Sequence, residues 1–188
     1  QKKRPALSIF MSKFPIINAP GVQVDNAAKK VTFDGYVKLI ETMVTPAGYS
    51  VFMKGGTIIR IAPDKSLVVL GNIVVDGKEN PIKVRPLMAK PFGTFAVLGD
   101  DHTSVNINGL HIEGGSEAFF QGLHFSGQIS LYHHKNVIFS NSFVSNSHSD
   151  DGLNIKSSAV ILSNNSFFDN FSDQVDLDFV SGEIFNNK

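Results

Sequence analysis

Apolar and polar residues alternate in short segments that recur through the second half of this chain with a period of about 23 residues. Four aligned copies begin at Val105, Ile129, Leu153 and Val175. Alternation with a period of two is typical of a strand with one buried face. A second set of short apolar segments follows the first, in the copies 137–139, 160–162 and 182–184. The pattern therefore predicts at least two stacked strands in each repeat.

Two further columns support the same repeat. Asparagine recurs after the second strand, at Asn141, Asn164 and Asn186, and phenylalanine recurs at an even spacing, at Phe119, Phe143 and Phe167. A long sequence period with several short strands in each copy indicates a solenoid, in which equivalent side chains lie above one another. We therefore expect an internal ladder of asparagine amides and a stack of phenylalanine rings.

The segments 136–143 and 150–157 resemble rungs of a known group, the right-handed parallel β-helices of the pectin-lyase-like superfamily. The resemblance covers positions 105–188 clearly and the segment before them weakly. It implies an all-β fold, a right-handed single-stranded parallel β-helix with coils of about 22–24 residues. It does not define an activity, because one fold supports many functions.

The remaining sequence suggests a single domain with an N-terminal cap. Residues 1–44 are expected to form an irregular capping segment, and residues 45–188 the parallel β-helix. Short strand-like segments between residues 57 and 84, separated by Gly, Pro or Asp, fit its early turns. An uncapped last coil would expose strand edges, so we expect further coils of the chain, or another chain, beyond residue 188.

Composition narrows the possible partners. The formal net charge is zero, so no overall electrostatic attraction to nucleic acid or anionic lipid is expected. No apolar run approaches the roughly 20 residues of a membrane span. Cysteine is absent, which excludes disulfides and thiolate metal sites and is compatible with export. Together with the resemblance, this favours an extracellular or cell-surface location.

The outward residues of the first strand suggest a binding face. Two outward columns are expected, which are Asn106, Ser130, Asn154, Asp176 and, beside it, Asn108, Tyr132, Lys156, Asp178. They would gather Tyr132, Asn154, Lys156, Asp176 and Asp178 on one patch. Polar groups and one aromatic ring suit sugar hydroxyls and a sugar ring face, and the resemblance implies polysaccharide binding at such a face.

Two catalytic alternatives stay open. The phrase 150–157 is similar to the paired-aspartate phrase of polygalacturonase-type glycoside hydrolases, which would make Asp151 the general acid with Asp150 beside it. The Gly-His-Gly and Arg-x-Lys phrases of that family are missing. A lyase acting on uronate-rich glycans would instead use Lys156 as the base, with Ca²⁺ bound by the carboxylates of Asp173, Asp176 and Asp178.

The histidines show no zinc-binding spacing, and we interpret His111, His124, His133 and His134 as surface or turn residues. The leading hypothesis is a secreted or cell-surface β-helix module that binds or supports polysaccharide and requires no cofactor. The sequence leaves open whether it is an enzyme. The alternatives are a polysaccharide lyase or hydrolase and a structural stalk or adhesin segment.

Overall fold

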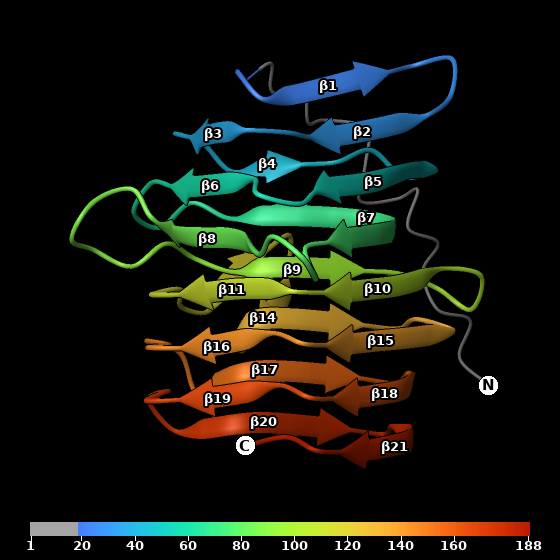
Figure 1. Ribbon diagram of the computed structural model, residues 1–188, viewed down its shortest axis with the longest axis vertical. Coiled ribbons are helices and arrows are strands. Elements are labelled where there is room, and N and C mark those ends of the chain that lie inside the picture. Colours follow the sequence, from blue (N-terminus) through green and yellow to red (C-terminus); the bar gives the residue numbers. More distant parts are fainter. Residues whose placement is uncertain (1–18) are drawn as a thin grey trace.

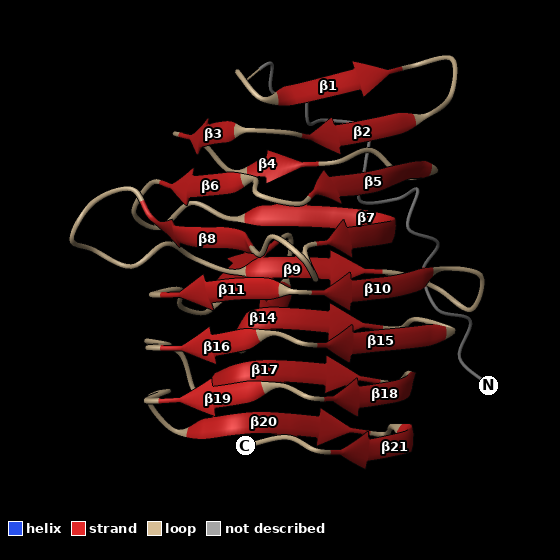
Figure 2. Cartoon of the chain, in the orientation of Figure 1, coloured by secondary structure: helices blue, strands red, loops and turns tan. Residues whose placement is uncertain are grey.

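The computed structural model describes residues 19–188, and these residues form strands and turns without any helix (Figure 2). The strands stack in parallel as a β-solenoid of about six turns, which confirms the expected fold class (Figure 1). Each turn contributes one strand to each of three sheets, which we call sheets A, B and C. No helix in this part of the chain could cross a membrane.

The strands of the three sheets follow one another in the order A, B, C along each turn. Sheet A contains β2 (Lys30–Phe33), β5 (Tyr49–Lys54), the second half of β7 (Leu67–Asp76), β10 (Ser104–Asn108), β15 (Asn136–Ser140), β18 (Ala159–Ser163) and β21 (Ser181–Phe185). Sheet B contains β3 (Tyr36–Leu39), β6 (Ile58–Ile61), β8 (Ile82–Pro86), β11 (Leu110–Glu113), β16 (Phe143–Ser145) and β19 (Ser166–Phe168). Sheet C contains β4 (Met43–Val44), the first half of β7, β9 (Phe95–Leu98), β14 (Gly127–Tyr132), β17 (Asp151–Lys156) and β20 (Asp173–Asp178).

The core is made of inward side chains that stack in register from turn to turn. In sheet C, for example, Leu67, Phe95, Ile129 and Leu153 are paired in succession and are fully buried. Each such side chain contributes roughly 1.5–3 kcal/mol of hydrophobic free energy. The alternation read from the sequence therefore places the right residues inside the solenoid.

The solenoid begins earlier in the chain than expected. Strand β2 pairs in parallel with β5, and β3 pairs with β6, so the first turn starts near Lys30 and not at residue 45. Strand β1 (Val22–Asp25) pairs antiparallel with β2 and covers its free edge. The rest of the expected cap, residues 1–18, lies outside the described residues.

The register of the first copy in the predicted repeat is wrong. Val105 lies in sheet A and pairs with Val137, whereas Ile129 lies in sheet C and pairs with Phe95. The outward residues Asn106 and Asn108 therefore do not belong to the columns of Ser130 and Tyr132. The cause is an insertion between β11 and β14, which contains a hairpin of β12 (Ala118–Phe120) and β13 (Leu123–Phe125). The insertion lengthens this turn, so one regular period counted from Val105 ends on the wrong sheet.

Neither predicted ladder is formed by the predicted residues. Asn141, Asn164 and Asn186 have positive φ angles of 50–57° and make the turn from sheet A to sheet B, with Asn141 and Asn164 exposed. Asparagine is one of the few residues that adopts this left-handed conformation readily. The predicted phenylalanine column fails as well, because Phe143 pairs with Ser166 and Phe119 is 75% exposed in the hairpin.

A buried asparagine ladder is formed instead by the residues that follow Asn164 and Asn186, namely Asn165 and Asn187. The Oδ1 atom of Asn165 accepts a hydrogen bond from the backbone amide of Ser142 at 3.0 Å, and its Nδ2 donates to Oδ1 of Asn187 at 2.9 Å and to the carbonyl of Phe139 at 2.9 Å. Side-chain amides thus satisfy backbone groups that the sharp turn leaves without sheet partners.

Candidate functional site

The predicted patch on the outer face of sheet C is assembled in the structure. The Lys156 ammonium lies 2.9 Å from Oδ2 of Asp178 and 5.5 Å from the centre of the Tyr132 ring. Nδ2 of Asn154 donates to Oδ2 of Asp176 at 2.7 Å. We call these five residues, which come from β14, β17 and β20, the sheet C patch.

Two members of the sheet C patch are not available to a ligand. Tyr132 is only 5% exposed and Asn154 is fully buried. The Tyr132 ring stacks on Phe125 of the β12–β13 hairpin with 5.3 Å between ring centres. The expected sugar-stacking ring is therefore already covered by the protein itself.

The hairpin extends this cover over the upper part of sheet C. A second apolar cluster forms on the outer side of the sheet, separate from the solenoid core, and consists of Val44, Val68, Leu70, Ala96, Leu98, Phe125 and Tyr132. Phe120 and Leu123 of the hairpin pack against it. Sheet C is consequently apolar on both faces in this region, as expected for parallel strands that are covered on both sides.

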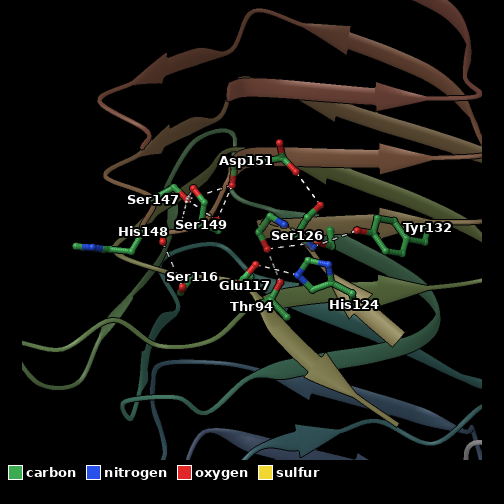
Figure 3. Close-up of polar contacts among 12 residues, drawn as sticks. Thr94, Ser116, Glu117, His124, Ser126, Tyr132, Ser147, His148, Ser149 and Asp151 are labelled. Carbon is green, nitrogen blue, oxygen red and sulfur yellow. Dashed lines mark hydrogen bonds and ion pairs between the residues drawn. The ribbon is translucent and has the colours of Figure 1, made fainter. Parts of the chain in front are cut away.

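Asp151, the candidate general acid, is buried and held by serines (Figure 3). The Ser126 hydroxyl donates to its Oδ2 at 2.7 Å, and the Ser147 and Ser149 hydroxyls donate to its backbone carbonyl at 3.1 and 2.7 Å. Burial raises the pKa of the Asp151 carboxyl, and the nearby acidic residues act in the same direction, while the Ser126 hydrogen bond opposes them. A raised pKa suits a general acid, but a side chain that is 2% exposed cannot reach a polysaccharide.

Asp150, its expected partner, is exposed at the turn before β17 and accepts a hydrogen bond from the Asp173 backbone amide through its own carbonyl. The expected base Lys156 is ion-paired with Asp178. Burial, the largest single influence, opposes the charged form of Lys156, but hydrogen bonding to Asp178 and the charges around it outweigh burial and raise its pKa. An ammonium held in its charged form is a poor proton acceptor.

The acids expected to bind Ca²⁺ do not converge. Among residues 19–188, no three or more His, Asp or Glu side chains are grouped so that they could hold a metal ion. Asp176 and Asp178 are instead engaged by Asn154 and Lys156. Calcium binding thus receives no support from the arrangement of these carboxylates.

His134 lies in the turn between β14 and β15, as expected, but its side chain is not at the surface. His134 is buried, with Nδ1 3.0 Å from the Thr103 hydroxyl and Nε2 3.2 Å from the Val97 carbonyl. Nε2 must carry the proton because a carbonyl can only accept, so Nδ1 accepts from Thr103. Burial lowers the pKa of His134 to about 4. The neutral imidazole thus joins Val97 of β9 to Thr103 in the turn after β9 through hydrogen bonds.

Sequence reasoning missed a charged surface on sheet B. Lys38, Arg60 and Arg85 are paired in register on β3, β6 and β8, and Lys83 lies beside Arg85 on β8. We call these four residues the sheet B strip. Among the outward residues of β3, β6, β8 and β11 the one acid is Glu113, which pairs with Arg85 at 2.9 Å.

A hollow with aromatic walls lies at the lower end of the sheet B strip. It has a volume of about 280 Å³ and is lined by Arg85, His111, Ile112, Glu113 and Phe143. The His111 and Phe143 rings meet edge to face with 6.0 Å between centres. Burial, together with the positive charges of Lys83 and Arg85, lowers the pKa of His111.

The sequence did contain a signal for the sheet B strip. In each of the phrases 36–38, 58–60 and 83–85, a cation stands two residues after another outward position. The signal is easily overlooked because the regular repeat that assigns outward positions begins only at Val105, after these strands. A net charge of zero also conceals it, since the cations of sheet B are balanced by acids elsewhere, including those of β17 and β20.

Comparisons with known proteins do not identify the chain. No family model, no curated protein and no solved structure matches it. The structure establishes the fold as a parallel β-solenoid, and the relationship to the pectin-lyase-like superfamily stays a prediction.

Proposed function

We propose that this solenoid is a non-catalytic module that binds an acidic polysaccharide along the outer face of sheet B. The observation that carries the proposal is the in-register stack of Lys38, Arg60 and Arg85 on adjacent strands. Parallel strands lie about 4.8 Å apart, so the cations form a row that a chain of carboxylate-bearing sugars can follow. Arginine is suited to such a ligand because its planar guanidinium binds carboxylates through two hydrogen bonds.

The aromatic hollow gives this row a second means of recognition. Ring faces and edges of Phe143 and His111 offer apolar surface to the C–H face of a sugar, while Arg85 stands at the same hollow to engage a carboxylate. Tyr36, at the other end of sheet B, is 51% exposed, and the Lys38 ammonium lies 5.8 Å from its ring centre. Cations alternating with rings favour an acidic sugar polymer over a simple anion.

The contacts of Asp151 and Lys156 give no support to the lyase and hydrolase alternatives. Asp151 is buried beneath the surface that a glycan could touch, and Lys156 is engaged by Asp178. We therefore place the ligand on sheet B and not on the sheet C patch. The expectation of a secreted or cell-surface location is kept as part of this proposal, because acidic polysaccharides are found mainly there.

The test is a binding titration by calorimetry with polygalacturonate and with a neutral glucan. The decisive variant combines Lys38→Gln, Arg60→Gln and Arg85→Gln, and the charge-matched control combines Lys78→Gln, Lys90→Gln and Lys135→Gln in exposed loops. At about 0.2–1 kcal/mol for each exposed ion pair, the first triple variant should weaken binding by roughly tenfold and the control should not. Binding should also weaken with added salt.

Three outcomes would overturn the proposal: equal binding of the neutral glucan, unchanged affinity in the sheet B variant, or release of unsaturated or reducing sugars from the polymer. Equal competition by single-stranded DNA of matched charge would show a general polyanion surface instead. Binding should in addition raise the pKa of His111, because bound carboxylates offset the charges of Lys83 and Arg85, and this can be followed by NMR titration.

A further inference from the structure

The outer face of sheet A carries an unusual column of exposed apolar residues. The strand registers place seven outward residues in one line down the solenoid, which are Thr32, Phe52, Val74, Asn106, Ile138, Ile161 and Glu183. Val74, Ile138 and Ile161 are 41%, 37% and 40% exposed. Nothing in the described part of the chain covers these three side chains fully, in contrast to the outer face of sheet C.

The order of residues in this column is nearly symmetric about its centre. Asn106 stands in the middle, with Val74 and Ile138 on either side of it. Phe52 and Ile161 come next, and the polar residues Thr32 and Glu183 follow them on the first and last described strands of the sheet. A surface that contacts its own copy across a two-fold axis needs this kind of self-complementarity, in which residue i meets residue j and residue j meets residue i.

From this symmetry we infer that two copies of the chain associate face to face through sheet A, with their solenoids running in opposite directions. The two-fold axis lies between the faces and parallel to the strands, at the level of Asn106. Val74 of each copy then faces Ile138 of the other, and Phe52 faces Ile161. The inference is independent of the proposed polysaccharide binding, which uses sheet B.

The shapes of the two halves of sheet A fit this arrangement. The lower half has a hollow of about 570 Å³, whose walls include Asn106, Ile138, Ile161 and Glu183. It is open because short side chains occupy the neighbouring outward column, which consists of Ser104, Asn136, Ala159 and Ser181. The upper half carries the larger side chains of Phe52 and Val74, which would enter that hollow on the other copy. The two-fold axis produces this contact twice.

The charges at the two ends of the face are also complementary. Lys30 lies at the top of sheet A with its ammonium 5.1 Å from the Phe52 ring centre, and Glu183 lies on the last strand, β21. Reversal of one solenoid brings Lys30 of one copy close to Glu183 of the other. The opposite arrangement, with both solenoids in the same direction, would place Glu183 at the level of its own equivalent.

The size of the face predicts a weak dimer. The seven described strands of sheet A, at about 4.8 Å each, and five residues at about 3.3 Å cover roughly 30 by 16 Å, which is about 500 Å² for each copy. The total of about 1,000 Å² is at the lower limit for a specific protein–protein interface. Association is therefore expected at high micromolar protein concentration, and the Ile138→Asp variant should weaken it at least tenfold.

Cross-linking tests the geometry directly, because the chain contains no cysteine and any introduced thiol is unique. Facing sheets lie about 10 Å apart, so a short bis-maleimide is suitable. We expect Asn106→Cys to cross-link to itself, and an equal mixture of Val74→Cys and Ile138→Cys to cross-link as a heterodimer. Val74→Cys by itself and Ile138→Cys by itself should not cross-link efficiently.

Charge reversal provides an independent check by analytical ultracentrifugation. Lys30→Glu alone or Glu183→Lys alone should weaken the dimer by about threefold, and the double variant should restore it, because the contact then has its charges exchanged. Efficient self-cross-linking of Val74→Cys would show solenoids in the same direction and overturn the arrangement. A monomer at every concentration, with circular dichroism confirming a folded chain, would overturn the dimer itself.

Discussion

Sheets B and C belong to the same turns of the solenoid, yet their outer faces differ completely. In sheet C the outward residues Val68, Leu70 and Ala96 are as well buried as the core, because the β12–β13 hairpin and Phe125 contribute to a second apolar cluster. In sheet B the six outward positions of the corresponding turns are exposed or half-exposed, and four of them are the cations of the sheet B strip. The comparison teaches that alternation determines which side chains leave the core, while a segment from elsewhere in the chain decides whether they meet solvent.

The largest effect is expected when Phe125, which covers the outer face of sheet C, is truncated. Phe125→Ala should lower the free energy of unfolding by about 3–5 kcal/mol, since a fully buried ring is lost and a cavity remains over sheet C. Ile58→Ala on sheet B, where the side chain is 36% exposed, should cost clearly less. Urea unfolding of both variants measures the two losses. Equal losses would mean that the outer cluster of sheet C is not a second core.

The next largest effect concerns His134, on the covered side of the molecule. Its folded-state pKa of about 4 lies below the ordinary value of 6.5. Between these pH values, His134 therefore binds a proton in the unfolded chain but not in the folded chain. Stability is therefore lost as the pH falls from 6.5 to 4, by up to about 3 kcal/mol.

His134→Gln should remove this loss, so the variant should show a smaller difference in unfolding free energy between pH 7 and pH 4. The exposed His102→Gln is the matched control and should behave as the wild type. An unchanged pH dependence in the His134 variant would contradict burial of a neutral imidazole.

Asp151 should respond to pH in the opposite sense. Because burial raises the pKa of this carboxyl above its ordinary value of 3.8, its contribution is most favourable below that value and is lost as the pH rises through the folded-state pKa. Asp151→Asn should therefore stabilise the protein at pH 7, by less than the His134 effect, and should give no gain at pH 3. Thermal unfolding at both pH values measures this, with Asp150→Asn as the exposed neighbour control. A loss of polysaccharide cleavage in Asp151→Asn would instead revive the hydrolase alternative.

The smallest effect is expected at Lys156. Its ion pair with Asp178 is about one-third exposed, so Lys156→Gln should cost about 0.2–1 kcal/mol of stability. The sheet B counterpart is Arg85→Gln, which breaks the similarly exposed pair with Glu113 and should cost about as much. The two variants should differ in polygalacturonate affinity, which only Arg85→Gln should reduce. If Lys156→Gln reduced affinity more, the ligand would lie on sheet C.

Much of the fold could be predicted because stacked strands repeat their inward residues. The alignment of Ile129, Leu153 and Val175 is confirmed, as is that of Val137 and Val160. The position of Val105 was wrong because the hairpin lengthens its turn, and a fixed period cannot anticipate an insertion. The apolar runs 67–70 and 95–98 are strands buried on both faces, which the alternating pattern of the repeat did not predict.

The sheet C patch was predictable in position but not in accessibility. The strand register brings Lys156 beside Asp178 and Asn154 beside Asp176, and both pairs follow from the repeat. Burial of Tyr132 depends on Phe125 of the β12–β13 hairpin, whose place in space no local pattern gives. Similarly, Asn164 and Asn165 are neighbours in sequence, and only the backbone angles distinguish the exposed turn residue from the member of the buried ladder.

The corners of the solenoid differ in how much sequence they can accept. Sheet A passes to sheet B through one residue after β10, two after β15 and at most five, after β7, with the chain in a left-handed conformation at Gly109 and Asn141. The corner from sheet B to sheet C is four residues long before β20, five before β17 and thirteen before β14, and all three leave the stacking of the strands intact. That second corner is thus a natural grafting position, where loops or whole peptides can be displayed on a rigid rod while its diameter and strand spacing stay the same.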